Sequence, residues 1–475
     1  MLPNEALTFS IGAATVFLIY CVASTIYLRY LHPLRSFPGP FQASISGDWL
    51  YRQLAGDFPE KSFSKLHAQY TLRIPPNELH VTDISLYHVI YSQAAPFAKF
   101  KPFYDGFMTP HTVFAEDDPN LHKKRRRMLN PFFSRTGVLK LEPIIMEKAE
   151  ILSSKIRRLC TTDDINVYDA FRSFTTEFIL EFAFGRPGGL DNAGESFPMM
   201  VGKPWVRTIA QRIPRSLVRC LVPELSNFLN ILNFAEQSMR FWQLGSTKPG
   251  HPVIFDSLTG LKDDEKVSEA VDILIAGADT TASSLTTAVQ KILADPAIHS
   301  QLTNALDDMF PDKREFIPLR ELETCEYLNA CVKEALRIGM AVPGRLPRVV
   351  PADGAPFRVD GKVVTPGTVV SISAYTMHTS TEAWGPDALA FSPKRWLGPD
   401  TKHLDHYLVT FSKGARSCIG QNLAPAEMTI VLGWLFRNFR LSLPPGLKEP
   451  RLVDRFTLQH DKHGVPIRFE ARDRG

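Results

Sequence analysis

Cysteine is scarce in this sequence, and no two cysteines stand in a pattern that pairs them or binds zinc. The 475 residues contain six, at Cys21, Cys160, Cys220, Cys325, Cys331 and Cys418. There is no Cys-x-x-Cys pair and no histidine partner at zinc-finger spacing. These absences argue against a disulfide framework and a structural zinc site, and they favour free thiols in a reducing compartment.

Strong net charge, internal repeats and low-complexity segments are also lacking. A formal net charge of +4 is small for 475 residues, and it argues neither for nor against a nucleic acid partner. The hydrophobic content of 44% is enough for a large core. The length is compatible with about two to three domains or with one large domain.

Charge is absent from one long stretch at the N-terminus. From Ala6 to Leu28 the chain has 23 residues without a charged side chain, and as a helix they would span about 34 Å against a hydrocarbon core of about 30 Å. A cleaved signal peptide is the alternative, but this stretch is too long for one and lacks a positively charged start. Because Glu5 precedes it and Arg29 and Arg35 follow it, we expect one membrane-spanning helix with the body of the protein on the cytosolic side.

Proline marks the end of this segment. Pro33, Pro38 and Pro40 stop the helix and stiffen the link to the rest of the chain. The sequence therefore predicts a membrane anchor over residues 1–30, a proline-rich hinge over residues 31–40 and one large domain over residues 41–475.

Helical patterns dominate that large domain. An acidic start at Asp263 opens an apolar-periodic run that continues to about Ala294 and ends at Asp295-Pro296. Strand-like patterns are confined to residues 72–83, residues 345–375 and a shorter hairpin near residues 456–469. The expected fold is mainly α with small β-sheets.

Near the C-terminus, Cys418 lies in a loop suited to bind the iron of a haem. A thiolate binds iron well when its neighbours leave room for a flat macrocycle and donate hydrogen bonds to the sulfur. Gly414 can turn the loop in conformations closed to other residues, and Gly420 lets the backbone lie close against a porphyrin. Arg416 offers a permanent cation to a haem propionate. The alternative is a buried cysteine in a glycine-containing loop.

The complete ten-residue pattern favours the haem interpretation. The chain from Phe411 to Gly420 reads Phe-x-x-Gly-x-Arg-x-Cys-x-Gly, and this run resembles the haem-binding loop of the cytochrome P450 family. The resemblance implies the cytochrome P450 fold and a haem b whose iron is bound by Cys418. The run from His32 to Pro40 resembles the hinge of microsomal members from filamentous fungi, which implies a single-pass protein of the endoplasmic reticulum.

The predicted long helix contains Ala-Gly-Ala-Asp-Thr-Thr, starting at Ala276. Asp and Thr weaken a helix because both compete for backbone hydrogen bonds, so the helix is either merely distorted there or the pair has a function. The segment resembles the oxygen-activation motif of the family and lies about 140 residues before the cysteine. The resemblance implies that Ala276 and Gly277 let the helix pass over the iron, while Asp279 and Thr280 deliver protons to oxygen.

Four further motif residues carry positive or negative charge. Glu334 and Arg337 are three apart on a predicted helix, as in an ordinary surface pair. Arg395 follows in Phe-Ser-Pro-Lys-Arg-Trp, and in the family these three form a buried triad that fixes the loop leading to the cysteine. Arg348, in Pro-Gly-Arg-Leu-Pro-Arg, resembles the residue that gives a cation to the haem.

The densest basic run, His122 to Arg127, invites a nucleic acid interpretation. We expect no nucleic acid partner, because the run starts an amphipathic helix. His122 and Arg126 share one face of it and suit a haem propionate, although His122 stands where many family members have tryptophan. The remaining cations form either a docking face for an acidic electron donor or a plain solvated surface.

The resemblance covers the chain from the anchor to the end, with its motifs in the expected order. It implies a monooxygenase that uses O2 and electrons delivered from NADPH by cytochrome P450 reductase, with cytochrome b5 as an alternative donor. A haem-thiolate isomerase or dehydratase on the same fold is a second interpretation, and the retained Asp279–Thr280 pair argues against it. A non-catalytic haem-binding membrane protein is a third.

The sequence points to an apolar small-molecule substrate. Aromatic and sulfur side chains gather where the family places a pocket roof, at Phe97, Phe100, Phe103, Tyr104, Phe107, Met108 and Phe114. Residues 205–234 are also apolar and lightly charged. Ordinary core packing is the alternative for each of them. With the fungal-type hinge, these residues favour a terpenoid or polyketide-derived intermediate of fungal secondary metabolism.

Overall fold

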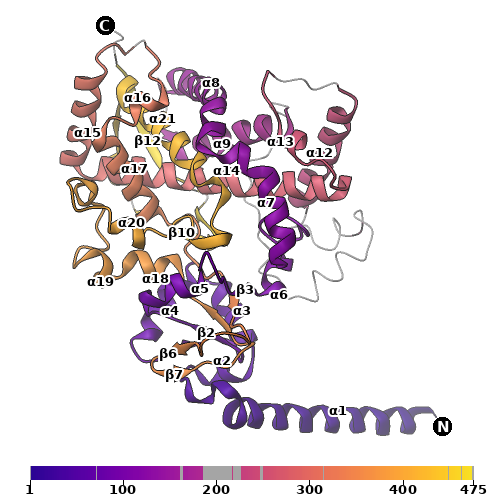
Figure 1. The fold of residues 1–475 in the computed structure, drawn as a ribbon. Helices are drawn as coiled ribbons and strands as arrows, with labels where there is room; N and C mark the ends of the chain where they lie inside the picture. Colours follow the sequence, from indigo (N-terminus) through magenta and orange to yellow (C-terminus); the bar gives the residue numbers. More distant parts are fainter. Residues whose placement is uncertain are drawn as a thin grey trace.

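Helices make up most of the structure. The computed structural model describes residues 2–70, 72–160, 164–185, 217, 226–245, 250–313, 315–447, 449–461 and 463–472. The longer helices that form the body are α7 (Pro119–Phe133), α8 (Arg135–Leu159), α9 (Val167–Phe184), α12 (Ser226–Gln243), α14 (Asp263–Ala294), α15 (Pro296–Met309), α17 (Glu326–Gly339) and α21 (Leu423–Asn438). Figure 1 shows them gathered in one body, with the two chain termini at opposite ends of the molecule.

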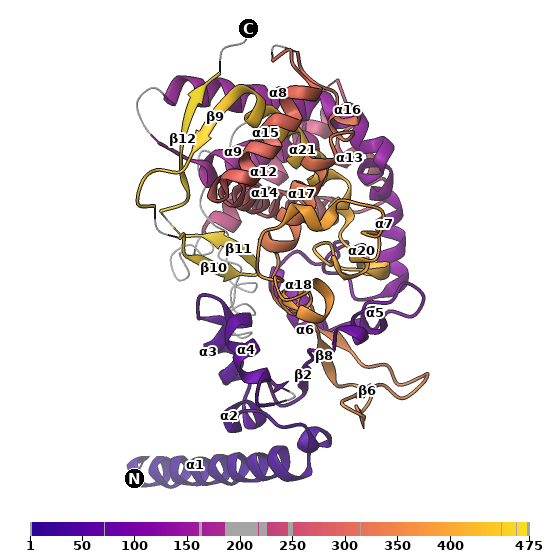
Figure 2. The same cartoon turned by 90° about the vertical axis from the view of Figure 1, so that its left-hand side faces the viewer.

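Helix α14 crosses the middle of this body. The Lys262 N–H donates to Glu265 Oε2 at 3.0 Å, and this bond satisfies a backbone donor at the helix start. Asp295 ends α14 and caps α15 by accepting the Ala297 N–H at 2.9 Å, so the predicted bounds of the long helix are confirmed. Helices α9, α12 and α17 pack against α14 (Figure 2). The largest apolar cluster of the protein surrounds these contacts.

A five-stranded sheet lies beside the helical body, on the side of the N-terminus. Its strand order is β1 (Leu72–Arg73), β2 (Glu78–His80), β8 (Val369–Ser371), β5 (Arg348–Val349) and β3 (Ala98–Lys99). A separate hairpin joins β6 (Arg358–Val359) to β7 (Lys362–Val363). Both predicted strand zones are therefore confirmed. Strand β3 lies outside them, because a strand of two residues leaves no alternating pattern to read.

The C-terminal strands pair differently from the prediction. Strand β10 (Leu452–Arg455) pairs with β11 (Thr457–His460), and the turn between them is Phe456, with a φ of 81°. Strand β12 (Pro466–Ala471) pairs instead with β9 (Phe439–Ser442) and β4 (Ile165–Asn166). The predicted hairpin over residues 456–469 is wrong, because the partners of β12 are distant in the chain and local patterning does not identify them.

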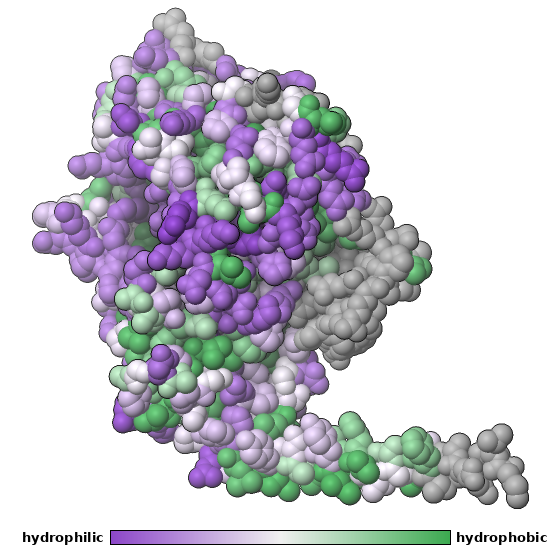
Figure 3. Space-filling view, turned by 45° about the vertical axis from the view of Figure 1, so that its right-hand side comes forward, coloured by the Kyte–Doolittle hydropathy of each residue, from purple (hydrophilic) through white to green (hydrophobic). Residues whose placement is uncertain are grey.

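Helix α1 (Leu2–Ile26) extends away from the body and continues as a π-helical turn at Tyr27–Leu31. Its apolar side chains are exposed along the part that Figure 3 colours. The segment Phe9–Leu31 has a mean hydropathy of 1.9 and none of it is buried. Within the described part of the chain, it is the one helix long and apolar enough to cross a membrane.

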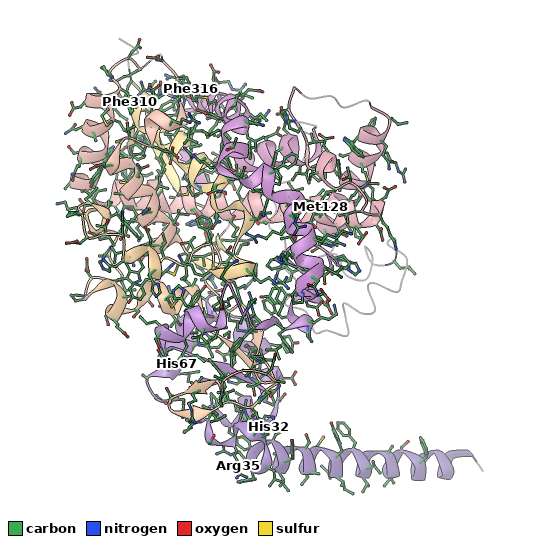
Figure 4. The ribbon with its side chains drawn as sticks, viewed as in Figure 1. His32, Arg35, His67, Met128, Phe310 and Phe316 are labelled. Atoms are coloured by element: carbon green, nitrogen blue, oxygen red, sulfur yellow. The ribbon has the colours of Figure 1, made fainter. Side chains whose placement is uncertain are left out.

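His32 and Arg35 lie where α1 joins the body (Figure 4). Arg35 Nη1 donates to Tyr30 O at 3.0 Å. From the sheet side, Arg73 Nη1 donates to Leu28 O at 3.1 Å. Carbonyls at the end of a helix lack partners within it, so these two arginines tie the end of the apolar helix to the body.

Candidate active site

The loop before α21 is closed by its own backbone. The Cys418 N–H donates to Phe411 O at 2.8 Å, and the Ser417 N–H donates to Gly414 O at 3.0 Å. The loop is also held from outside, since the Ala415 N–H donates to Ser92 O at 3.3 Å. These bonds place the cysteine immediately before the N-terminal end of α21.

Two glycines give this loop its shape. Gly414 has a φ of 72°, and a Cβ there would stand 2.2 Å from Tyr91 O, so no other residue fits without moving the backbone. A Cβ on Gly420 would lie 3.7 Å from Cys418 Sγ, beside the sulfur. Gly414 therefore serves the close approach to Tyr91, whereas Gly420 keeps the space next to the thiol clear.

The surroundings of Cys418 act on its thiol in two directions. The residue is exposed, yet burial among protein atoms raises the pKa of its thiol. The Gly420 N–H and the charge of Arg126 act in the opposite direction on this pKa and favour the thiolate. Arg126 reaches the loop directly, donating to Ser417 O at 2.6 Å.

A cluster of cations lies next to the loop. Burial and the charges of Arg416, Lys99, Arg126 and Arg348 lower the pKa of His122 to about 3. Burial and Arg348 also lower the pKa of Lys99 well below its ordinary value and that of Arg416 to about 10. His122 is therefore neutral, and it offers a ring N–H rather than a charge.

This cluster fits the two carboxylates of a haem. Arg348 is 1% exposed, and its hydrogen bonds to described residues all use Nη1, including one to the Tyr104 hydroxyl at 2.5 Å. Its Nε and Nη2 groups find no acceptor among the described residues. Mutually repelling buried cations favour an added anion, and an anionic sulfur ligand with two propionate sites is the donor set that a haem requires.

Lys99 belongs to this cluster but was not among the residues that the motifs identify. Its Nζ donates to Phe114 O, and the side chain is buried. In the sequence it is a single lysine between apolar residues, which carries no recognisable signal. Only the pairing of β3 with β5 brings it beside Arg348.

Helix α14 presents Ala276 and Thr280 on one face, a single turn apart. Ala276 is exposed and Thr280 is partly exposed, although the helix runs through the middle of the body. The Thr280 hydroxyl donates to Ala276 O at 2.7 Å, and α14 is continuous through this turn. Gly277 faces elsewhere, since a Cβ on it would stand 2.6 Å from Ile179 Cδ1 of α9.

The carboxylate of Asp279 points away from that face. Asp279 is 3% exposed, and its Oδ1 accepts from Arg172 Nε at 2.8 Å. Its Oδ2 accepts from Gln459 Nε2 of β11 at 3.4 Å. The motif does not identify Arg172, which lies 107 residues earlier in the chain. Asp279 and Thr280 are thus adjacent in the chain, but their side chains have different hydrogen-bond partners.

The structure brings together the three residues of the expected triad. Glu334 is fully buried, and Arg337 binds it through two bonds, at 2.9 and 2.7 Å. Arg395 Nε donates to Glu334 Oε1 at 3.0 Å. The Trp396 indole N–H donates to Oε2 at 2.8 Å. Every lone-pair direction of the buried carboxylate is therefore engaged by a donor from α17 or from residues 392–396.

The triad is connected to the cysteine loop through His378. Arg337 Nη1 donates to His378 O at 2.8 Å. The ring Nε2 of His378 in turn accepts the Val409 N–H at 2.9 Å, two residues before Phe411. This path supports a structural role for the triad in holding the loop.

The expected pocket roof is only partly assembled as predicted. Phe107 packs against Phe114 and against Phe456, each with ring centroids 4.7 Å apart. Phe456 was not predicted, because its role comes from the one-residue turn between β10 and β11. Phe97 packs against Phe357 at 5.2 Å in the apolar cluster of the sheet, so its placement in the roof is wrong. Residues 205–216 and 218–225 lie outside the described residues.

A model of the cytochrome P450 family matches residues 38–208 and 252–466. The chain belongs to the cytochrome P450 family. Curated relatives include the cytochrome P450 monooxygenase aneF of Aspergillus aculeatus, 32% identical and covering 90% of this chain and 92% of the relative. The cytochrome P450 monooxygenase hkm5 of Aspergillus hancockii is 31% identical, with coverage of 96% and 94%. The tryptophan 6-hydroxylase fscE of Fusarium equiseti is 31% identical, with 90% of each chain covered.

The fold is also that of a cytochrome P450. A crystal structure of a cytochrome P450 (CYP102L1) superposes with a TM-score of 0.72 at 18% identity, covering 88% of this chain and 95% of that chain. The predicted family and fold are confirmed. The protein is thus a cytochrome P450 monooxygenase, an oxygen-incorporating oxidoreductase whose cofactor is a thiolate-ligated haem and which acts on a small molecule with electrons from a redox partner.

Proposed function

We propose that this cytochrome P450 binds its haem through Cys418 and oxidises an apolar intermediate of fungal secondary metabolism, of terpenoid or polyketide origin. The observation that carries the proposal is the exposed Cys418, held in its glycine-containing loop beside four mutually repelling cations. The aromatic roof formed by Phe107, Phe114 and Phe456 supports an apolar substrate. The fungal relatives, which are named as monooxygenases, support the metabolic setting.

Different residues of the chain have different roles in the reaction. The haem, when bound, supplies the activation of oxygen and the oxidising power. Cys418 would bind the haem iron as a thiolate, and Arg126, Arg348, Arg416 and Lys99 would hold the propionates, with the neutral His122 as a further donor. The aromatic roof excludes water from the substrate.

Proton delivery is assigned to two residues of α14. The Thr280 hydroxyl, although it donates to Ala276 O at 2.7 Å, keeps lone pairs that accept a hydrogen bond from water and holds a proton donor beside the reacting oxygen. Asp279 is bound to Arg172 at 2.8 Å, so it carries protons inward only after its carboxyl group leaves that arginine.

We further propose that α1 spans the membrane of the endoplasmic reticulum once, with residues 1–30 as the anchor and 31–40 as the hinge. The exposed apolar segment Phe9–Leu31 supports the span, and the cations that follow it support a cytosolic body. The cytosolic side is where NADPH–cytochrome P450 reductase or cytochrome b5 would deliver electrons. Exposed Lys123, Lys124 and Arg127 on α7 offer a cationic face to an acidic donor.

A turnover assay with labelled oxygen tests this function. Full-length protein in membranes would be combined with NADPH, a cytochrome P450 reductase and isotopically labelled O2, using substrates first selected from a terpenoid and polyketide panel by their haem spectral shift. We expect labelled oxygen in the product. Conversion without NADPH or label would instead identify an isomerase or dehydratase. Binding without NADPH consumption would identify a non-catalytic haem protein.

A further inference from the structure

A cavity of about 410 Å³ lies between the N-terminal helices, the five-stranded sheet and the β10–β11 turn. Its walls are mainly apolar, with contributions from Leu50, Pro75, Phe103, Phe107 and Phe456. The same cavity is also lined by three acidic residues: Glu78, which is paired with Arg345, Glu60 of α4 (Pro59–His67) and Asp454 of β10. The last two come from distant parts of the chain.

Both carboxylates are removed from bulk solvent. Glu60 is 2% exposed and Asp454 is 8% exposed. The Phe456 N–H donates to Asp454 Oδ1 at 2.8 Å. His80 Nε2 lies 3.2 Å from Glu60 Oε2, without hydrogen-bond geometry. Burial and the charge of Glu60 raise the pKa of Asp454 to about 6.

The other two oxygens converge on one point of the cavity wall. A Cβ on Gly344 would lie 3.6 Å from Asp454 Oδ2 and 3.9 Å from Glu60 Oε1. No donor among the described residues bonds to either of these oxygens. Arg345 also lines the cavity, but its guanidinium is paired with Glu78 of β2. Both oxygens are open to the cavity, and two carboxylates that face one mainly apolar cavity favour a ligand that brings positive charge.

Part of the cavity wall leads toward the cations assigned to the haem. Phe456 and Phe107 line the cavity and both pack against Phe114, at 5.8 and 4.7 Å. Phe114 packs against Tyr104 at 5.4 Å, and the Tyr104 hydroxyl accepts from Arg348. One layer of aromatic rings therefore separates the cavity from the proposed haem site.

We propose that this cavity is a subsite for an ammonium group of the substrate, bound by Asp454 Oδ2 and Glu60 Oε1, with the apolar body of the substrate directed toward Phe456 and Phe107. The proposal rests on the proposed function and narrows its substrate to an intermediate that carries an amino group besides its apolar body. An ammonium ion fits better than a divalent metal, because aromatic faces attract organic cations. No group of three or more His, Cys, Asp or Glu side chains in the described part of the chain could hold a metal ion.

The test compares three probes that share a phenyl-alkyl body: (3-phenylpropyl)trimethylammonium, 3-phenylpropanol and 4-phenylbutanoate. The quaternary nitrogen has no lone pair, so it does not ligate iron. Binding to the full-length, haem-loaded protein would be measured by equilibrium dialysis. We expect the ammonium probe to bind about tenfold more tightly than the alcohol, the ratio that corresponds to 1.4 kcal/mol, and the carboxylate to bind most weakly.

Two variants and a control test whether these two carboxylates cause the preference for the ammonium probe. Asp454→Asn keeps an oxygen for the Phe456 N–H, and Glu60→Gln keeps the shape of the second side chain. Each should remove the preference for the ammonium probe and leave the alcohol affinity unchanged. Asp57→Asn, an exposed carboxylate paired with Arg451, should retain the preference.

An ammonium affinity no greater than that of the alcohol, or an unchanged preference in both variants, would overturn the subsite. The carbon monoxide spectrum is measured on the same samples. Loss of the preference in Asp454→Asn with a wild-type spectrum supports the subsite. A preference absent from wild-type protein with a normal thiolate spectrum rejects the subsite alone. Absence of the thiolate spectrum from wild-type protein rejects the proposed function, whatever the probes do.

Discussion

Asp279 and Thr280 are adjacent in the chain, yet they face different surroundings. Thr280 lies on the same face of α14 as the exposed Ala276, while Asp279 is paired with Arg172. The sequence identified Asp279 and Thr280 as candidate proton-delivery residues because they are adjacent in one motif. It did not reveal Arg172, Lys99 or Phe456, whose contacts depend on which helices and strands pack together.

Replacing Thr280 by alanine separates oxygen use from product formation. Neither the cysteine loop nor the cation cluster depends on this hydroxyl, so haem content and substrate affinity should stay near wild type. Without the proton held at Thr280, NADPH consumption should continue while oxygen leaves as hydrogen peroxide and product per NADPH falls. Peroxide and product would be measured together in reductase-driven turnover.

Thr286→Ala is the matched control, because its hydroxyl also donates one turn back, to Ala282 O at 2.8 Å, but is fully buried. It should couple NADPH to product as wild type does. Full coupling in Thr280→Ala would remove the hydroxyl from the proton route. Loss of haem in that variant would show that the hydroxyl serves only the helix.

At the scale of elements, α14 holds the loop that carries the aromatic roof. Glu269 is fully buried and accepts the Val113 N–H at 3.0 Å. Asp272 accepts from the Thr109 hydroxyl at 3.4 Å. The helix itself was predictable to its exact bounds from its acidic start and the Asp-Pro after its end. The contacts of Glu269 and Asp272 to residues 109–113 were not predictable, because they join segments more than 150 residues apart.

Glu269→Gln should change how stability depends on pH. Burial and the neighbouring Asp272 raise the pKa of Glu269 from 4.5 to about 8. Because the folded pKa lies above the unfolded value, stability from Glu269 is full below pH 4.5 and is lost as pH rises toward 8. The variant lacks this loss, so its free energy of unfolding relative to wild type should rise by up to about 1.4 kcal/mol per pH unit across that range.

Urea unfolding at several pH values measures this difference. Glu150→Gln, an exposed position on α8, serves as the surface control. A difference between Glu269→Gln and wild type that is constant with pH would mean that Glu269 does not gain a proton on folding.

The triad joins α17 to the segment before the cysteine loop, and Glu334→Ala should disrupt it. Removing the carboxylate leaves Arg337, which is fully buried, without its partner, at a cost of about 3–5 kcal/mol. That is a large share of the stability of a domain. We expect little haem-bound protein on purification, measured as haem per polypeptide.

Glu326→Ala, exposed on the same helix, should retain its haem. A Glu334→Ala protein with full haem and selectively slow turnover would argue for a role in the chemical step.

At the scale of the whole molecule, α1 is the element that stands apart from the body (Figure 1). An apolar helix here was predictable because an uncharged run of this length has few alternatives. The five-stranded sheet was predictable only as zones, because β2 and β8 pair across almost 300 residues, Glu78 with Val369. The residues of the cysteine loop were predictable from the motif, since that loop is local in sequence.

Removing residues 1–34 should release the protein from membranes without loss of haem. The deleted helix has exposed apolar side chains, and Arg73 donates to Leu28 O near its end. Membranes washed with carbonate should retain the full-length chain and lose the truncated one. Retention of the truncated chain after that wash would place the anchor elsewhere.

The central claim is that Cys418 is the thiolate ligand of the haem, and the carbon monoxide difference spectrum of the reduced protein tests it most directly. Wild-type protein should show the absorption band typical of thiolate-ligated haem. Cys418→Ala should lose that band, while Cys160→Ala, which removes another partly exposed thiol, should keep it. Retention of the band by Cys418→Ala would contradict the account.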